Sequence, residues 1–154
     1  MKKIFLIIVF TIITISCKAQ NTINSDELTV NGIIVMGQNK SVLTSSFGQP
    51  LLIEKDFSEM DNVDMYIYKY NGVVFYVIND LIDDYEITNN NYNFTKHNIK
   101  IGNNVSSLQN VFSLSYNKKS NEHISLWIKE HDKYVSIHFD KVSKIITKIR
   151  IGTY

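Results

Sequence analysis

The sequence of 154 residues contains one cysteine, one proline and one tryptophan. A single cysteine excludes an intramolecular disulfide, and with it the class of small disulfide-stapled scaffolds. The 16 basic residues nearly balance the 15 acidic ones, which gives a formal charge of +1. Nucleic-acid binding needs a clustered basic face, so this balance argues against a nucleic-acid partner.

Patterns typical of catalytic and metal sites are also lacking. None of the four histidines stands in a His-Glu-x-x-His motif, no serine lies in a Gly-x-Ser-x-Gly elbow, and the six glycines are scattered. Asp84 and Glu86 alternate onto one strand face, where a solvated edge explains them. We expect no enzymatic activity, no catalytic residue, no metal and no cofactor. A metal site would require a hairpin to bring together His123, His131 and His138.

The N-terminus is typical of an export signal. Lys2 and Lys3 precede an almost unbroken apolar run over 4–13, which has the length of a secretory signal and is short of the about 20 residues of a membrane span. Thr14-Ile15-Ser16-Cys17 resembles a bacterial lipobox. We therefore expect a signal peptide over 1–16, lipid on Cys17 and a polar tether over 17–27. The alternative is cleavage after Ala19, which releases a soluble secreted protein.

An internal repeat organises the remaining chain. Gly37, Leu43 and Phe47 align with Gly102, Leu108 and Phe112 at one constant offset, together with Ile34 with Ile99 and Ser41 with Ser106. In the first copy, extended runs flank Asn71-Gly72, a strong hairpin signal; the second copy is expected to turn at His131-Asp132. We predict one α+β domain over 28–154, made of two tandem units at about 28–90 and 91–154. Each unit has a short helix and about three antiparallel strands, and the two form one sheet with both helices on one face.

The pattern Gly37-x3-Ser41-x-Leu43-x3-Phe47-Gly48-x-Pro50, with its weaker second copy, resembles the tandem fold of the beta-lactamase inhibitory protein and of the SmpA/OmlA-type outer-membrane lipoproteins. The second copy departs from the first, because Ser113-Leu114-Ser115 replaces Gly48-Gln49-Pro50. The resemblance implies a sheet that docks proteins, and it carries over no binding residue.

Strand alternation assigns Val74 and Tyr76 to the helix-side core and leaves the second sheet face rich in aromatic residues. Tyrosine and tryptophan are enriched at binding hot spots, although they also favour strands for packing reasons alone. The predicted protein-binding residues are Tyr66, Tyr68, Tyr70, Phe75, Trp127, Tyr134, His138, Lys148 and Arg150.

Together these features predict a non-enzymatic lipoprotein of the bacterial envelope, facing the periplasm, that binds a protein partner. The preferred role is an inhibitor or immunity protein against a toxin or hydrolase that reaches the periplasm. One alternative is an accessory lipoprotein of the outer-membrane assembly machine, as the resemblance implies. Another is a small hydrolase or ligand-binding protein with a polar pocket near the histidines.

Overall fold

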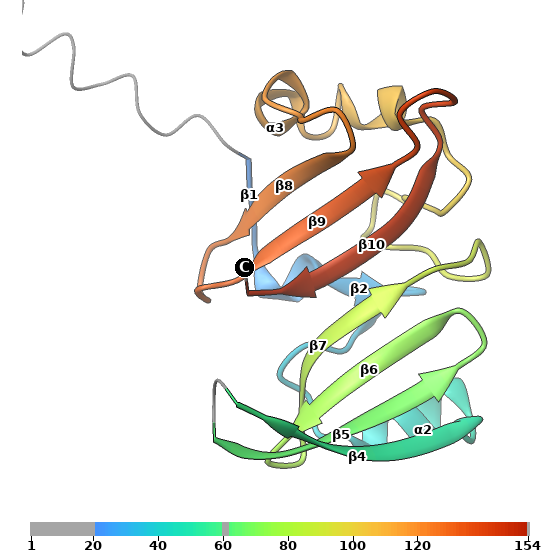
Figure 1. The fold of residues 1–154 in the computed structure, drawn as a ribbon, viewed down its shortest axis with the longest axis vertical. Helices are drawn as coiled ribbons and strands as arrows, with labels where there is room; N and C mark the ends of the chain where they lie inside the picture. Colours follow the sequence, from blue (N-terminus) through green and yellow to red (C-terminus); the bar gives the residue numbers. More distant parts are fainter. Residues whose placement is uncertain (1–20, 60–61, 154) are drawn as a thin grey trace, which may run out of the picture.

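The computed structural model describes residues 21–59 and 62–153. Its centre is an eight-stranded sheet in the order β1-β8-β9-β10-β7-β6-β5-β4 (Figure 1). β1 (Thr22–Ile23) runs parallel to β8 (His123–Ile128), and the other neighbouring strands of this sheet are antiparallel. The sheet is therefore mixed.

The two halves of the chain lie side by side in this sheet. The first half contributes the meander β4 (Leu52–Ser58), β5 (Val63–Tyr70), β6 (Val73–Ile78) and β7 (Leu81–Ile87). The second half contributes β8, β9 (Tyr134–Phe139) and β10 (Ile146–Gly152). Because β10 pairs with β9 on one side and β7 on the other, the last strand of the chain joins the halves.

Shorter elements lie behind the sheet and at its upper end in the view of Figure 1. β2 (Thr29–Val30) and β3 (Ile33–Ile34) form a small separate sheet. The helices of the described chain are short: α2 (Ser41–Phe47), α3 (Ser113–Asn117) and the 3-10 turns η1 (Ser25–Glu27) and η2 (Val105–Leu108). None of them has the length and apolar character needed to cross a membrane.

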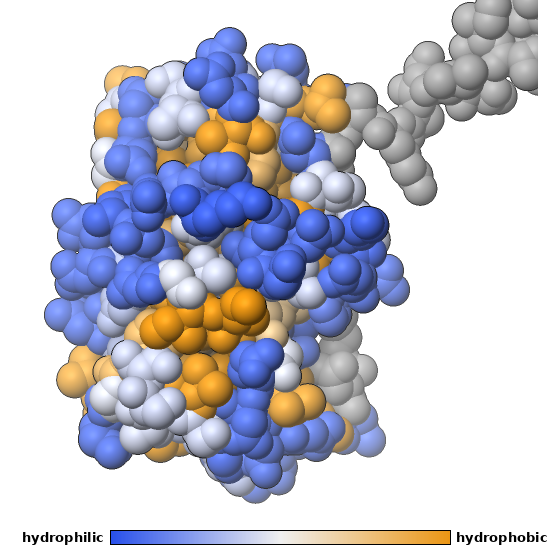
Figure 2. Space-filling model, turned by 180° about the vertical axis from the view of Figure 1, so that it is seen from behind, coloured by the Kyte–Doolittle hydropathy of each residue, from blue (hydrophilic) through white to orange (hydrophobic). Residues whose placement is uncertain are grey.

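The core lies between the sheet and these covering elements. In β8 and β9 the buried positions alternate with half-exposed ones, which turns Ile124, Leu126, Val135 and Ile137 inward. Figure 2 shows the molecule from behind the view of Figure 1. On this side, apolar side chains reach the surface between broad polar areas. Large apolar side chains that remain exposed come mostly from the first half, among them Leu51, Leu52, Ile53 and Phe57.

The predicted hairpin at Asn71-Gly72 is present, with Tyr70 opposite Val73. Gly72 has a φ of +88°, and an added Cβ would lie 1.8 Å from the Asn89 amide nitrogen. That amide nitrogen donates to the Asn71 carbonyl at 2.9 Å. The turn thus needs glycine both for its left-handed backbone and for the close approach of Asn89.

The prediction of two tandem helix-plus-strand units is wrong. The molecule is mostly one mixed sheet, and the stretches that align in sequence fold differently. Ser41 begins α2, whereas the equivalent Ser106 lies in η2, and α3 begins only at Ser113. Gly48, with a φ of +78°, ends α2. The second copy has no glycine or proline at the matching place, so its chain continues into α3.

The last part of the predicted tether lies in regular structure. Thr22–Ile23 form β1, which takes an edge position in the sheet, and Ser25–Glu27 form η1. Asn21 exchanges two hydrogen bonds with Ser115 of α3, each 3.0 Å long. The signal peptide over 1–16, Cys17 and Ala19 lie outside the described residues.

Candidate functional site

We call the face of the large sheet that points away from the core the outer face. In Figure 1 it faces the viewer, and none of the described helices crosses in front of its strands. Because Ile124, Leu126 and Ile128 are buried, the residues between them turn outward. In the second half the outer face carries His123, Ser125, Trp127, Tyr134, Ser136, His138, Lys148 and Arg150.

Two ring pairs follow the β8–β9 ladder. Trp127 lies opposite Tyr134, and the two rings meet edge to face with centroids 4.7 Å apart. Nearer the other end, His123 lies opposite His138, with centroids 5.9 Å apart. Edge-to-face pairs hold aromatic rings in place, so this part of the outer face is a partly exposed and ordered aromatic surface.

Charged residues border these rings where β10 meets β7. Arg150 lies opposite Ser136 on one side and Glu86 on the other, and Lys148 lies opposite His138. The Lys148 ammonium is 3.7 Å from the Glu86 carboxylate. Arg150 is exposed. The border therefore presents both signs of charge, with an exposed guanidinium.

Burial lowers the pKa of His138 below 6.5, and the nearby positive charge of Lys148 lowers it further. The ring is thus neutral near pH 7, with one nitrogen that donates and one that accepts. A shallow hollow of about 180 Å³ opens beside it, lined by Ser136, His138, Arg150, Gly152 and Thr153. These groups suit hydrogen bonds to another chain.

A second set of charged residues forms ion pairs at the edge of the outer face. The Lys133 ammonium contacts Asp83 at 2.6 Å and Asp84 at 2.8 Å. Lys133 lies in the turn before β9, whereas both aspartates lie in β7. The ion pairs therefore connect the second half to the first across the end of β10.

The structure separates the predicted binding residues into two groups. Trp127, Tyr134, His138, Lys148 and Arg150 lie together on the outer face. The first-half residues lie on the core side, because Tyr66, Tyr68 and Tyr70 pair with Val77, Phe75 and Val73, which are fully buried.

The assignment of faces in β5 and β6 is therefore wrong by one residue, and Val74 and Tyr76 point outward. Phe75 has no exposed surface, and the Tyr70 hydroxyl donates to the Gly48 carbonyl at 3.2 Å. Neither residue is available to a partner. Large apolar side chains occur on both faces of these strands, so alternation alone does not choose between them.

His123, Ser125 and Ser136 also lie on the outer face, and the predicted binding residues did not include them. The observed hairpin is centred one residue before the expected turn at His131-Asp132, because Trp127 pairs with Tyr134 and His123 with His138. His131 itself lies in that turn, at the far end of the strands, so the three histidines do not converge. Within residues 21–59 and 62–153 no group of His, Cys, Asp or Glu side chains has the arrangement of a metal site.

Comparison with known proteins finds no matching protein-family profile and no matching curated sequence. Similar solved structures include the following two. An extracellular protein containing a SCP domain from Bacillus anthracis aligns with a TM-score of 0.51 and 14% identity, over 77% of this chain and 44% of its own. A cysteine-rich secretory protein from Staphylococcus aureus aligns with a TM-score of 0.54 and 20% identity, over 86% of this chain and 49% of its own.

This chain therefore spans less than half of each neighbour, and at these identities the likeness shows the fold alone. The resemblance to the beta-lactamase inhibitory protein and to SmpA/OmlA lipoproteins is wrong, because the structural neighbours are SCP-domain proteins. The short glycine-helix-glycine pattern that suggested it arises in many small α+β units. The predictions of an outer-membrane lipoprotein and of an immunity protein, which depended on this resemblance, are wrong as well. A secreted or envelope location agrees with neighbours described as extracellular and secretory.

Proposed function

We propose that this chain is an exported, non-enzymatic domain that binds a protein partner through the second half of its outer face. The observation that carries the proposal is the gathering of Trp127, Tyr134, His138, Lys148 and Arg150 on one uncovered sheet surface. Export is supported by the charged and apolar N-terminal pattern and by the descriptions of the two structural neighbours.

The chemistry of this surface suits a protein ligand. Tryptophan, tyrosine and arginine are the residues that most often dominate binding energy at protein interfaces. The edge-to-face contact of Trp127 with Tyr134 fixes both rings before binding, and pre-ordered side chains lose less entropy when a partner covers them. The partner would bury the rings and bond to Arg150 and His138.

The serine–histidine contact in this region has a structural explanation. The Ser120 hydroxyl lies 2.7 Å from His123 Nδ1, but its oxygen also accepts the backbone N–H groups of Glu122 and His123. This is the hydrogen bonding of a tight turn. A catalytic triad would add a carboxylate on the histidine, and no described carboxylate bonds to His123. Binding therefore accounts for the outer face better than hydrolysis.

The test is a binding measurement with the purified mature protein and a partner captured from envelope and culture-fluid extracts. Trp127→Ala should raise the dissociation constant about 30-fold or more, because a hot-spot truncation costs about 2 kcal/mol. Tyr66→Ala is the matched control, since Tyr66 is an exposed tyrosine on the opposite side of the sheet. Equal losses in the two variants, or no loss in either, would contradict the proposal. Arg150→Glu compared with Lys141→Glu, in an exposed loop, repeats the test for charge.

Export itself is tested by mass spectrometry of the mature N-terminus. A start at Cys17 with bound acyl chains, or a start at Gln20, agrees with export and distinguishes the two processing routes. Recovery of the intact chain, with Met1 retained, in the cytoplasm would contradict it.

A further inference from the structure

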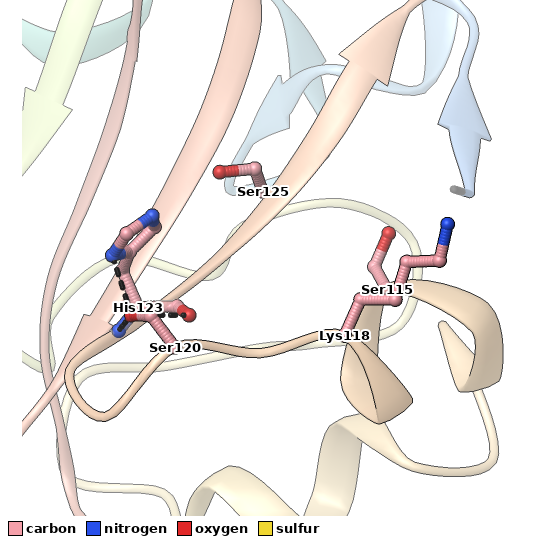
Figure 3. Close-up of a pocket in the computed structure, with 5 residues that line it drawn as sticks. All are labelled: Ser115, Lys118, Ser120, His123 and Ser125. Carbon is pink, nitrogen blue, oxygen red and sulfur yellow. Dashed lines mark hydrogen bonds between the residues drawn. The ribbon is translucent and has the colours of Figure 1, made fainter. Parts of the chain in front are cut away.

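A hollow of about 270 Å³ lies between α3 and the start of β8, but its polar groups do not converge on one ligand. Figure 3 shows His123 on one side of this hollow and Ser115 with Lys118 on the other. Ser115 is only 2% exposed and accepts a hydrogen bond from Asn21. A surface whose groups do point in one direction lies at the far edge of the large sheet.

β4 forms that edge, and no strand of the described chain pairs with its other side (Figure 1). It pairs with β5 along its whole length, from Leu52 to Ser58. The opposite edge of the sheet is formed by the two-residue β1. Native proteins often keep edge strands short, because a long open edge is a template for pairing with another chain. β4 is therefore the edge that is long enough to accept a further strand.

The backbone of β4 shows which groups face the open side. The Phe57 N–H donates to the carboxylate of its own neighbour Asp56 at 2.8 Å, so this N–H points away from β5. In an antiparallel ladder, a residue turns its N–H and C=O to the same side, and the side alternates along the strand. Ile53 and Lys55 therefore present their N–H and C=O groups to the open side as well. An added strand would bond to these three residues.

The two faces of this edge differ in chemistry. Ile53 and Phe57 are apolar and are 49% and 50% exposed. Ile53 lies opposite Tyr68, so both side chains are on the core side of the sheet. The side chains on the outer face of β4 are Leu52, Glu54, Asp56 and Ser58. The edge thus offers apolar contact on one face and two carboxylates on the other.

Acidic residues are in excess around this edge. Residues 21–86 contain eleven acidic and three basic residues. Each of these three lysines forms an ion pair within the same half: Lys40 with Asp80, Lys55 with Asp64 and Lys69 with Glu54. Asp56 and Glu59, at the end of β4 and in the turn after it, have no ion pair within the part of the chain that the structure describes. The negative charge that remains suits a basic partner.

A second copy of this chain does not fit the edge. In a closed antiparallel dimer the two-fold axis is normal to the sheet, so a residue lies opposite its own counterpart or one an even number of positions away. With the axis at Lys55, this lysine faces its counterpart and Glu54 faces Asp56. With the axis at Glu54 or Asp56, that carboxylate faces its counterpart. Like charges directly opposite are destabilising, so every register that pairs most of β4 is disfavoured.

We propose that β4 is the docking edge for an extended segment of another protein in which apolar and basic residues alternate. The segment adds one strand beside β4, and backbone hydrogen bonds hold it there. Its apolar side chains pack on Ile53 and Phe57, and its lysines or arginines lie opposite Glu54 and Asp56. β5, β6 and β7 separate this edge from the second half of the outer face, so binding here does not depend on the proposed function of that face.

The test is an amide NMR titration of the ¹⁵N-labelled mature protein with a short synthetic peptide in which valine and lysine alternate. Saturable shifts are expected at the amides of Ile53, Lys55 and Phe57. Asp56→Lys should weaken binding about tenfold, because it replaces an attraction by a repulsion. Asp26→Lys is the matched control, an exposed aspartate in η1, and should change the affinity less than about twofold because of screening.

Two further peptides separate backbone pairing from charge. A valine–lysine peptide with N-methyl groups on alternate residues loses the backbone bonds, and a valine–glutamate peptide reverses the charge, so neither should bind. Equal binding of either peptide, equal weakening by Asp56→Lys and Asp26→Lys, or shifts that do not saturate would overturn the proposal.

Sedimentation equilibrium examines the second copy as the occupant. The mature protein should be monomeric. Lys55→Pro removes an N–H that faces the open side and leaves the pairing with β5 in place. A wild-type dimer that this variant dissociates would assign the edge to a second copy and overturn the proposal.

Discussion

Aromatic residues occupy opposite faces in the two halves of the sheet. In the first half, rings fill the core. The ring centroids of Phe47 and Phe75 are 5.2 Å apart, and those of Phe75 and Tyr85 are 6.0 Å apart. In the second half the buried positions of β8–β10 are mostly aliphatic, and the aromatic pair Trp127 and Tyr134 stands on the outer face.

The covering elements explain this difference. α2 is seven residues long and buries only Leu43 completely, so large rings from the strands fill the space between helix and sheet. The isoleucines and valines of the second half pack closely without such rings. The number of aromatic residues therefore does not identify a binding surface. The buried residues that alternate with them along each strand show which face of the sheet the rings occupy.

The largest expected effect on stability tests the difference between the buried rings of the first half and the partly exposed rings of the second. Phe75→Ala should lower the free energy of unfolding by about 3–5 kcal/mol, because it opens a cavity among packed rings. Trp127→Ala should lower it by only about 0.5–1.5 kcal/mol, the loss of one ring contact at a partly exposed site. Urea denaturation measures both. Similar losses would show that Trp127 is part of the core rather than of a surface.

The second prediction concerns the connection between the halves. Lys133→Met should cost about 1–3 kcal/mol, because Asp83 and Asp84 lose their shared cation while Asp84 stays mostly buried. Lys129→Met is the matched control: an exposed lysine in the same turn, expected to change stability by less than about 0.5 kcal/mol. The same denaturation assay applies. A loss in the control equal to that in Lys133→Met would show that the ion pairs contribute nothing specific.

The Lys133 variant also has a defined pH dependence. Burial raises the pKa of Asp84 above 3.8, and the bond to Lys133 offsets this only in part. In the window between 3.8 and the raised value the folded protein holds more protons than the unfolded chain, so stability falls as the pH rises through it. Removing Lys133 raises the pKa of Asp84 further. The deficit of Lys133→Met should therefore shrink as the pH is lowered from 7 toward that pKa, and a constant deficit would contradict the assignment.

The smallest effect compares two tyrosine hydroxyls within the aromatic core. Tyr85 is fully buried, and its hydroxyl has no hydrogen-bond partner among the described residues. Tyr85→Phe should therefore raise stability by about 1 kcal/mol. Tyr70→Phe should lower it by about 0.5–1.5 kcal/mol, because Tyr70 donates to the Gly48 carbonyl. Losses in both variants would show that the Tyr85 hydroxyl is satisfied.

Local signals predicted the parts of the fold that depend on neighbouring residues. The hairpin at Asn71-Gly72 needs a left-handed backbone, and the Asn-Gly dipeptide alone predicts it. In β8 and β9, alternation correctly predicted which residues are buried, because the aliphatic residues lie on one side of the strands and the serines and histidines on the other. It failed in β5 and β6, where Tyr68 and Ile67 suit a core equally well.

The remaining features depend on contacts between distant parts of the chain. Thr22 and Ile23 form an edge strand because Trp127 and Ile128 lie beside them, and two residues carry no strand signal of their own.

The central position of β10 has a consequence for the timing of folding. This strand ends at Gly152 and lies between β9 and β7, so the large sheet closes only when the residues up to Gly152 are present. Closing a sheet through contacts so distant in sequence is slow compared with local folding. A chain still emerging from a ribosome or a secretion channel therefore lacks the strand that joins its two halves. Under the proposed export, the sheet would close only after its last strand has crossed the membrane.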